Sequence, residues 1–171
     1  MRDGPTEYER IYRAQSVRIL RLCRLLLGDP GEAEEVHQDV FVKLYHAQQT
    51  QVGPMRWEAW LTRVAVNACR DRRRSRWWKR WRNSQDVFED GITPGQRPSP
   101  EDEAVGRDTR ERIWRSFETL SARQREVFLL RHIEGWTTAE VARYLGLSTG
   151  SVKRHLFRAI ASLREAMGDR S

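Results

Sequence analysis

The chain has 171 residues, with 31 Lys and Arg, 24 Asp and Glu, and a formal net charge of +7 at pH 7. This length allows one or two small domains. No apolar run approaches the roughly 20 residues that cross a bilayer, and the N-terminus lacks the apolar core of a signal peptide, so we expect a cytoplasmic protein without membrane insertion. Basic groups dominate residues 1–82 and 109–171, whereas acids dominate residues 83–108. Two basic blocks favour a protein that binds nucleic acid.

Three helices are predicted in the first basic block. Thr6 and Glu9 form a capping box before an apolar pattern that ends at Gly28. Asp29 and Pro30 supply the cap and the first position of a second helix. We expect both helices to form one bundle with a third. The apolar positions expected inside are Ala33, Val36, Val40, Phe41, Leu44 and Tyr45 in the second helix, and Trp57, Trp60, Leu61, Val64 and Ala68 in the third.

The third helix continues into a basic run at residues 70–82. Polar residues at helical spacing form a stripe along it, namely Arg56, Arg63, Asn67, Arg70 and Arg74. Like charges on one helix repel unless a polyanion is near, which favours DNA over a merely solvated face. Trp77, Trp78 and Trp81 alternate with the cations. These rings either stack on unpaired bases or close the helix bundle, and the sequence leaves both interpretations open.

Residues 83–108 contain six Gly and Pro and seven acids, with little apolar periodicity, which predicts a flexible linker. Two helices are expected after it. Ser121 and Gln124 form the capping box of the second of these, and Gly135 follows its end. The apolar positions that indicate these helices are Ile113, Trp114, Phe117 and Leu120 in the first, and Val127, Phe128, Leu130 and Ile133 in the second.

The segment from Thr137 onward predicts a helix-turn-helix. Thr137 and Glu140 form a capping box, Gly146 ends the first helix, and Ser148 caps the second. The second helix has an apolar stripe of Val152, Leu156, Ala159, Ile160 and Leu163. Its other face presents the candidate DNA contacts Ser151, Lys153, Arg154, Phe157 and Arg158. Guanidinium groups match guanine edges in the major groove, which makes DNA the expected partner; the alternative is a helical hairpin with a solvated basic face.

The sequence offers no pattern for a metal site, a cofactor or catalysis. Cys23 and Cys69 form no CxxC pair, which predicts reduced packing residues, and the four histidines lack zinc spacing. The acids lie on predicted helix surfaces or in the linker, without the clustering that a nuclease needs to hold metal. We therefore expect no metal, no cofactor and no enzymatic activity.

Several of these segments resemble the extracytoplasmic-function (ECF) class of bacterial RNA polymerase sigma factors. Residues 21–28, 38–41 and 60–67 are similar to sigma region 2, and residues 120–131, 134–135 and 150–153 are similar to region 4. Both sets occur in the family's order, with a linker of suitable length between them. The resemblance covers nearly the whole chain.

The resemblance implies an all-α protein with a region 2 bundle at residues 1–82, a linker at 83–108 and a region 4 domain at 109–171. It implies that region 2 opens and reads the -10 promoter element and that region 4 reads the -35 element. Gln38 and Asp39 would dock on the clamp helices of the polymerase, and Asn67 would line the pocket of a flipped non-template base. Core RNA polymerase, promoter DNA and an anti-sigma factor are the implied partners. Residues 48–55 depart from the family's loop pattern, so the resemblance does not imply which base is flipped.

The alternative function is an autonomous helix-turn-helix transcriptional regulator. Such regulators usually bind two half-sites as dimers, because one small DNA-binding module buries only roughly 600–1,000 Å². This sequence has no extended heptad seam for a dimer, and its second basic block mixes aromatic rings with cations as a single-strand reader does. Both features favour the sigma factor.

Overall fold

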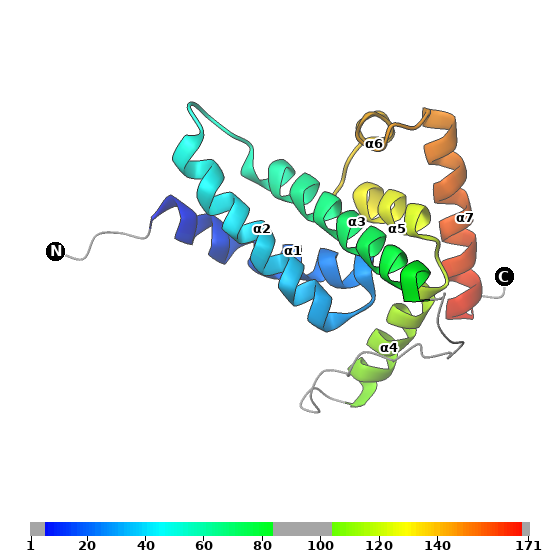
Figure 1. The fold of residues 1–171 in the computed structure, drawn as a ribbon. Helices are drawn as coiled ribbons and strands as arrows, with labels where there is room; N and C mark the ends of the chain where they lie inside the picture. The colour runs from blue at the N-terminus through cyan, green and yellow to red at the C-terminus, as the bar shows by residue number, and fades with distance from the viewer. Residues whose placement is uncertain (1–5, 84–103, 169–171) are drawn as a thin grey trace. The chain divides into compact units, whose positions relative to one another are not determined.

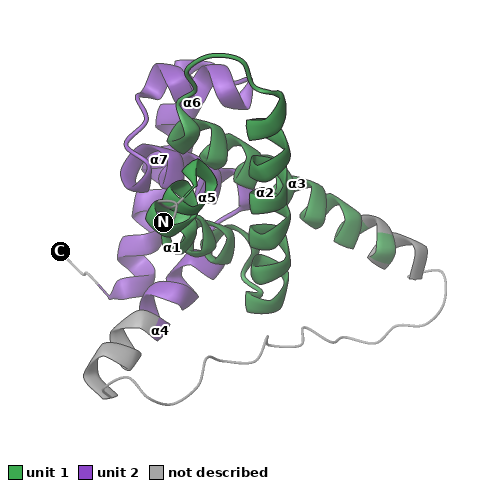
Figure 2. Ribbon diagram, turned by 90° about the vertical axis from the view of Figure 1, so that its left-hand side faces the viewer, with its two compact units in different colours: residues 1–97 green, residues 98–171 purple. Residues whose placement is uncertain are grey.

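Helices are the regular structure in the described part of the chain, residues 6–83 and 104–168 of a computed structural model (Figure 1). The predicted all-α class is confirmed there. The chain divides into two compact units, residues 1–97 and 98–171 (Figure 2). Most of the predicted linker lies outside the described residues, but residues 104–108 already belong to a helix.

The first unit is a bundle of α1 (Glu7–Leu27), α2 (Pro30–Thr50) and α3 (Trp57–Asn83), and each helix contacts the other two. Local sequence signals set the ends of the first two. The Thr6 hydroxyl accepts the Glu9 N–H, and the Glu9 carboxylate accepts the Thr6 N–H. Gly28 ends α1 in the left-handed region at φ 75°, and Asp29 caps α2 by accepting the Glu32 N–H.

The inner faces of α1 and α2 form most of the first core. Their fully buried residues include Ile19, Leu22, Cys23, Leu26, Ala33, Val36, Val40, Phe41 and Leu44. The prediction was wrong for Tyr45, which is half exposed and lies edge-on to Tyr8 at a centroid distance of 5.9 Å. Its hydroxyl-bearing ring sits at the rim of the bundle, where the polar end reaches water.

The buried face of α3 differs from the predicted one. Leu61 is fully buried as expected, but Trp57, Trp60, Val64 and Ala68 are only half-buried. The residues that face the core with Leu61 are Thr62, Ala65, Val66 and Cys69. Small side chains four residues apart let α3 approach α1 and α2 closely, so this face was not marked by the largest apolar residues. The expected packing role of both cysteines is confirmed, since Cys23 and Cys69 are buried and reduced.

The second unit contains α4 (Ala104–Glu118), α5 (Ala122–Phe128), a π-helix η1 (Leu129–Ile133), α6 (Thr138–Leu145) and α7 (Thr149–Met167). The Ser121–Gln124 capping box opens α5 as predicted. Its core is formed by residues from all five helices, including Phe117, Leu120, Val127, Leu129, Leu130, Val141, Leu145, Val152 and Ala159.

The π-helix changes the register after α5. The Glu134 N–H bonds to the Leu129 carbonyl, five residues back, at 2.9 Å. This wider turn leaves Leu129 buried, whereas Ile133, which belongs to the apolar pattern of the predicted helix, is half exposed. Gly135 follows in the left-handed region at φ 70°, which separates this segment from α6 as predicted.

His37 is a buried polar residue in the first core that the apolar pattern did not indicate. It is 8% exposed, and its Nε2 lies 3.0 Å from the Ser16 hydroxyl. Burial lowers the pKa of His37 below its usual 6.5, because the charged ring loses water. Burial therefore favours the neutral imidazole at this position.

We expect His37→Gln to reduce the loss of stability in acid. A folded pKa below the unfolded one gives stability that is present above the unfolded pKa and is lost as pH falls through the folded pKa. One proton limits the effect to about 1.4 kcal/mol per pH unit. Urea unfolding at pH 7 and pH 5 measures it, with His46→Gln, exposed on the same helix, as the control. An equal acid loss in His37→Gln and wild type would contradict the assignment.

Candidate nucleic-acid interface

The predicted helix-turn-helix is present as α6 and α7. The Thr137 hydroxyl accepts the Glu140 N–H, and the Glu140 carboxylate accepts the Thr137 N–H at 2.7 Å. Gly146 ends α6 in the left-handed region at φ 65°, where a Cβ is strained. Ser148 caps α7 by accepting the Ser151 N–H at 3.1 Å. Local hydrogen bonds thus define both helix ends at the turn.

The outer face of α7 is basic and exposed. Val152, Ala159 and Leu163 are buried, while Leu156 and Ile160 are half-buried, so the apolar stripe anchors α7 as predicted. On the opposite side, Lys153, Arg154, Phe157 and Arg158 are all exposed. Phe157 is 75% exposed, which is unusual for a large apolar ring. Ser151 is half-buried and also bonds to the Ser148 hydroxyl, so part of its hydrogen-bonding capacity serves the cap.

A shallow pocket of about 150 Å³ lies on this face of α7, lined by Ser151, Arg154, His155 and Arg158. Three of these were predicted and His155 was missed, although its spacing of four from Ser151 and three from Arg158 places it on the same side. Burial and then the charges of Arg123, Arg158 and Arg154 lower the pKa of His155. Cations and a hydroxyl around one pocket form a setting that attracts an anion such as phosphate.

In the first unit, the predicted polar stripe lies on and just before α3. Arg56 precedes the helix, and its carbonyl accepts the Trp60 N–H at 3.1 Å. Arg63, Asn67 and Arg74 are exposed, and Arg70 is half-buried. These residues therefore lie largely outside the core, as a nucleic-acid contact requires. Trp77 is 57% exposed, which weighs against a role in closing the bundle; the side chains of Trp78 and Trp81 lie outside the described residues.

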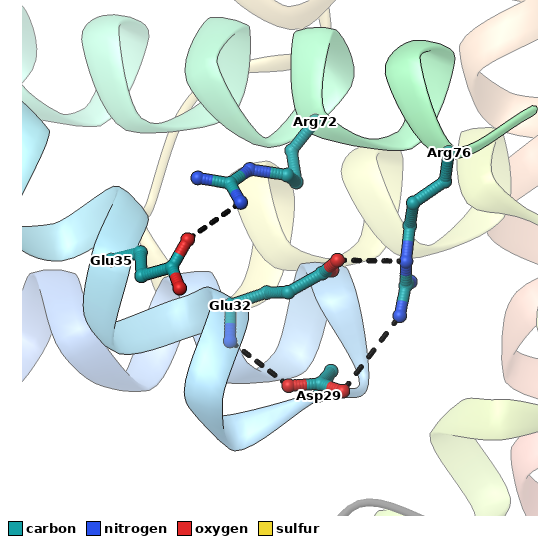
Figure 3. Close-up of polar contacts among 5 residues, drawn as sticks. All are labelled: Asp29, Glu32, Glu35, Arg72 and Arg76. Carbon is teal, nitrogen blue, oxygen red and sulfur yellow. Dashed lines mark hydrogen bonds and ion pairs between the residues drawn. The ribbon is translucent and has the colours of Figure 1, made fainter. Parts of the chain in front are cut away.

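The basic run divides between two sides of α3. Arg72 Nη1 lies 2.7 Å from Glu35 Oε2, and Arg76 Nε lies 3.0 Å from Glu32 Oε1 (Figure 3). Arg76 also approaches Asp29 at 3.8 Å. The hydrogen bond that Arg72 donates to the Glu35 carboxylate raises the pKa of Arg72, which favours the charged guanidinium. These contacts, which the sequence did not indicate, tie the second half of α3 to the start of α2.

Two further arginines of the run take other directions. Arg73 Nη1 donates to the Leu26 carbonyl at 3.3 Å, at the C-terminal turn of α1, where the helix dipole favours a cation. Arg74 points to solvent. One run of cations therefore serves the fold on one side and the solvent face on the other.

The residues predicted to dock on polymerase lie on the outer face of α2. Gln38 and Asp39 are exposed, and they stand between the buried His37 and the buried Val40. Both side chains are accessible to a partner without any change in the bundle. They lie in the same unit as the α3 stripe, whereas the α7 face belongs to the other unit.

Across residues 6–83 and 104–168, no group of three or more His, Cys, Asp and Glu is placed to hold a metal ion. Within the same ranges, no helix is long and apolar enough to cross a membrane.

Two family descriptions match the chain, one in each unit. Residues 11–79 match sigma-70 region 2, and residues 110–163 match sigma-70 region 4. The first match covers the three-helix bundle with the α3 stripe. The second covers the helix-turn-helix.

Curated relatives are similar over almost the full chain. An RNA polymerase sigma-E factor of Streptomyces coelicolor is 33% identical over 94% of this chain and 86% of its own length. An ECF RNA polymerase sigma factor, SigL, of Mycobacterium tuberculosis is 32% identical over 90% of this chain and 85% of its own length.

Two solved structures share the fold. The sigma factor RpoE of Bartonella quintana, in complex with the anti-sigma factor NepR, has a TM-score of 0.73 and 22% identity, over 96% of this chain and 99% of the other. CnrH, in complex with the cytosolic domain of CnrY, has a TM-score of 0.60 and 23% identity, over 96% of this chain and 89% of the other.

Proposed function

The chain belongs to the extracytoplasmic-function family of RNA polymerase sigma factors, and we propose how its two units divide the recognition of a promoter. As a member of this family it directs core RNA polymerase to promoters to start transcription. The region 2 unit reads and melts the -10 element, and the region 4 unit reads the -35 element. The observation that carries this division is the exposed basic face of α7 in one unit and the exposed Arg–Asn stripe of α3 in the other.

The α7 face suits duplex DNA. Arg154 lies in the N-terminal half of the recognition helix, where side chains reach base edges in the major groove. Arg158, one turn later, is placed to follow the phosphate backbone. Lys153, Phe157 and Ser151 complete the contact face, with the exposed ring available to a thymine methyl group.

The α3 face suits melted DNA. The amide of Asn67 can hydrogen-bond to an unpaired base edge, and the flanking Arg63, Arg70 and Arg74 attract the backbone of the same strand. Arg56, at the start of α3, extends this charge. The exposed Trp77 supplies a ring on which a base can stack.

On α2, Gln38 and Asp39 are the proposed contacts with core polymerase. Their exposure on a helix whose other side is buried makes this face available to a large partner. A further proposed partner is an anti-sigma factor, because the similar RpoE structure contains one. The proposed action of this chain with core polymerase also supports a cytoplasmic location and a non-enzymatic role for the chain.

The alternative of an autonomous regulator is less well supported. Residues 6–83 and 104–168 contain one helix-turn-helix, and such a module buries too little DNA surface to bind tightly alone. The remaining affinity must come from a larger assembly, which core polymerase provides.

The test is transcription with purified components. We expect core polymerase to start transcripts at defined sites on genomic fragments only when the chain is added, while the chain alone binds duplex DNA weakly and with little sequence preference. Tight binding of a palindrome by a dimer of the chain, without any gain in runoff transcription, would instead support the autonomous regulator.

Arg154→Ala is expected to cost about 1–3 kcal/mol in binding of the holoenzyme to the -35 element and to relax preference at one base pair. Arg158→Ala should weaken binding to all DNA sequences alike and should reduce the slope of log K against log salt concentration by about one unit. Competition binding to single-base variants of the element at two salt concentrations separates these effects. If Arg154→Ala shifts every variant equally, base reading belongs to another residue.

Asn67→Ala is expected to reduce promoter opening more than initial duplex binding, because an amide bonds to a base edge but attracts phosphate little. Permanganate reactivity of thymines near the start site measures opening. Arg63→Ala, one turn away on the same face, is the matched control and should weaken initial binding instead. An open-complex signal equal to wild type would remove Asn67 from the site.

A further inference from the structure

The ion pairs between α2 and α3 occupy cations of the proposed DNA-binding unit. Residues 70–82 carry eight Arg and Lys. Of these, Arg72 and Arg76 point toward the first turns of α2 and contact carboxylates (Figure 3). The two guanidinium groups are one helical turn apart, and they meet Glu35 and Glu32, which are also close to one turn apart.

One of the three carboxylates, that of Asp29, is also held by the backbone of α2. Asp29 caps α2, and one of its oxygens accepts the Glu32 N–H at 2.9 Å while the other faces Arg76. Acids in the first turn of a helix are also stabilised by its dipole. The Asp29 carboxylate therefore needs little further ordering to act as a counter-ion of Arg76, and Glu32 and Glu35 add two more negative charges beside it.

A guanidinium that bonds to a carboxylate must lose that bond before it contacts phosphate. The hydrogen bond to Glu35 raises the pKa of Arg72, which favours the charged guanidinium in this pair. Non-specific DNA binding depends on the number of phosphates that cations neutralise. When carboxylates hold Arg72 and Arg76, the chain neutralises fewer phosphates, and its non-specific affinity for DNA is lower. The opposite, exposed side of α3, where Arg74 and Asn67 lie, keeps its cation and its amide.

We propose that Glu32 and Glu35, with Asp29, are specificity-determining residues that act as intramolecular counter-ions. They hold Arg72 and Arg76 away from phosphate and so suppress sequence-independent DNA binding by the chain. This inference rests on the proposed function, in that α3 faces DNA. By this proposal, the acids of α2 increase the ratio of the affinity for promoter DNA to the affinity for non-promoter DNA.

The test uses the full chain on a duplex of non-promoter sequence. Glu32→Gln combined with Glu35→Gln keeps the shape of both side chains and removes their charge. We expect tighter binding at 50 mM salt and a steeper salt dependence, by up to about 0.9 units for each new phosphate contact. For two contacts, the loss of affinity between 50 and 200 mM salt grows about tenfold relative to wild type.

A matched variant controls for net charge. Glu7→Gln combined with Asp71→Asn removes the same charge from the same unit, and both acids are exposed and lie outside the ion pairs of Arg72 and Arg76. We expect only a small gain from it. If both double variants gain equally, net charge explains the effect and the proposal is wrong.

A reciprocal variant tests the arginines themselves. Arg72→Gln combined with Arg76→Gln should change non-specific binding by less than about twofold in the wild-type background and should abolish the gain in the Glu32, Glu35 background. A clear loss in the wild-type background would overturn the proposal, because the arginines would then contact DNA despite their pairs. Circular dichroism checks folding, and Glu35→Gln alone, which releases only Arg72, is the milder variant should the double one unfold.

Transcription separates this proposal from the proposed function. If the wild-type chain drives runoff transcription with core polymerase while the Glu32, Glu35 variant binds random DNA no tighter than the matched control, the counter-ion role fails and the sigma function stands. If the chain drives no transcription, the proposed function fails whatever the salt dependence.

Discussion

The repulsion among cations on α3 is the constraint on which the first unit depends. Eight of the thirteen residues from 70 to 82 are basic, and they continue a helix whose first half is buried against α1 and α2. Helical geometry sends successive arginines in different directions. Arg72 and Arg76 meet the acids of α2, Arg73 meets the end of α1, and Arg74 faces solvent. The α2 and α1 contacts offset part of the repulsion and leave an outward face for DNA.

The second unit is under a different constraint. The orientation of α7 matters there more than charge repulsion along the helix. Three serine or threonine caps, at Ser121, Thr137 and Ser148, fix where its helices start, and Gly146 fixes the turn. Each cap satisfies backbone N–H groups that would otherwise need water. The buried Val152 and Ala159 then set the rotation of α7, so that its cationic side faces outward.

Features that depend on residues within four positions of one another were predictable from the sequence. The caps, the glycine turns and the basic face of α7 are of this kind, and all are confirmed. Features that depend on which turn of one helix packs against a second helix were not predictable from the sequence. The small residues Ala65 and Cys69 carry little hydrophobic signal, yet both are fully buried on α3. Glu35, the partner of Arg72, lies 37 positions away in the sequence, and no spacing rule connects the two residues.

Phe157 shows how exposure helps to separate function from packing. A ring that is 75% exposed contributes little to the core, and the same helix already has a complete apolar stripe on its other side. Exposed apolar area is unfavourable in water, so folding of this unit gives no reason for a phenyl ring beside Arg154 and Arg158. A major-groove surface does give one, because thymine presents a methyl group there that only an apolar contact distinguishes. In the proposed complex with DNA, the arginines would supply attraction and hydrogen bonds, and the ring would add a contact that charge alone cannot make.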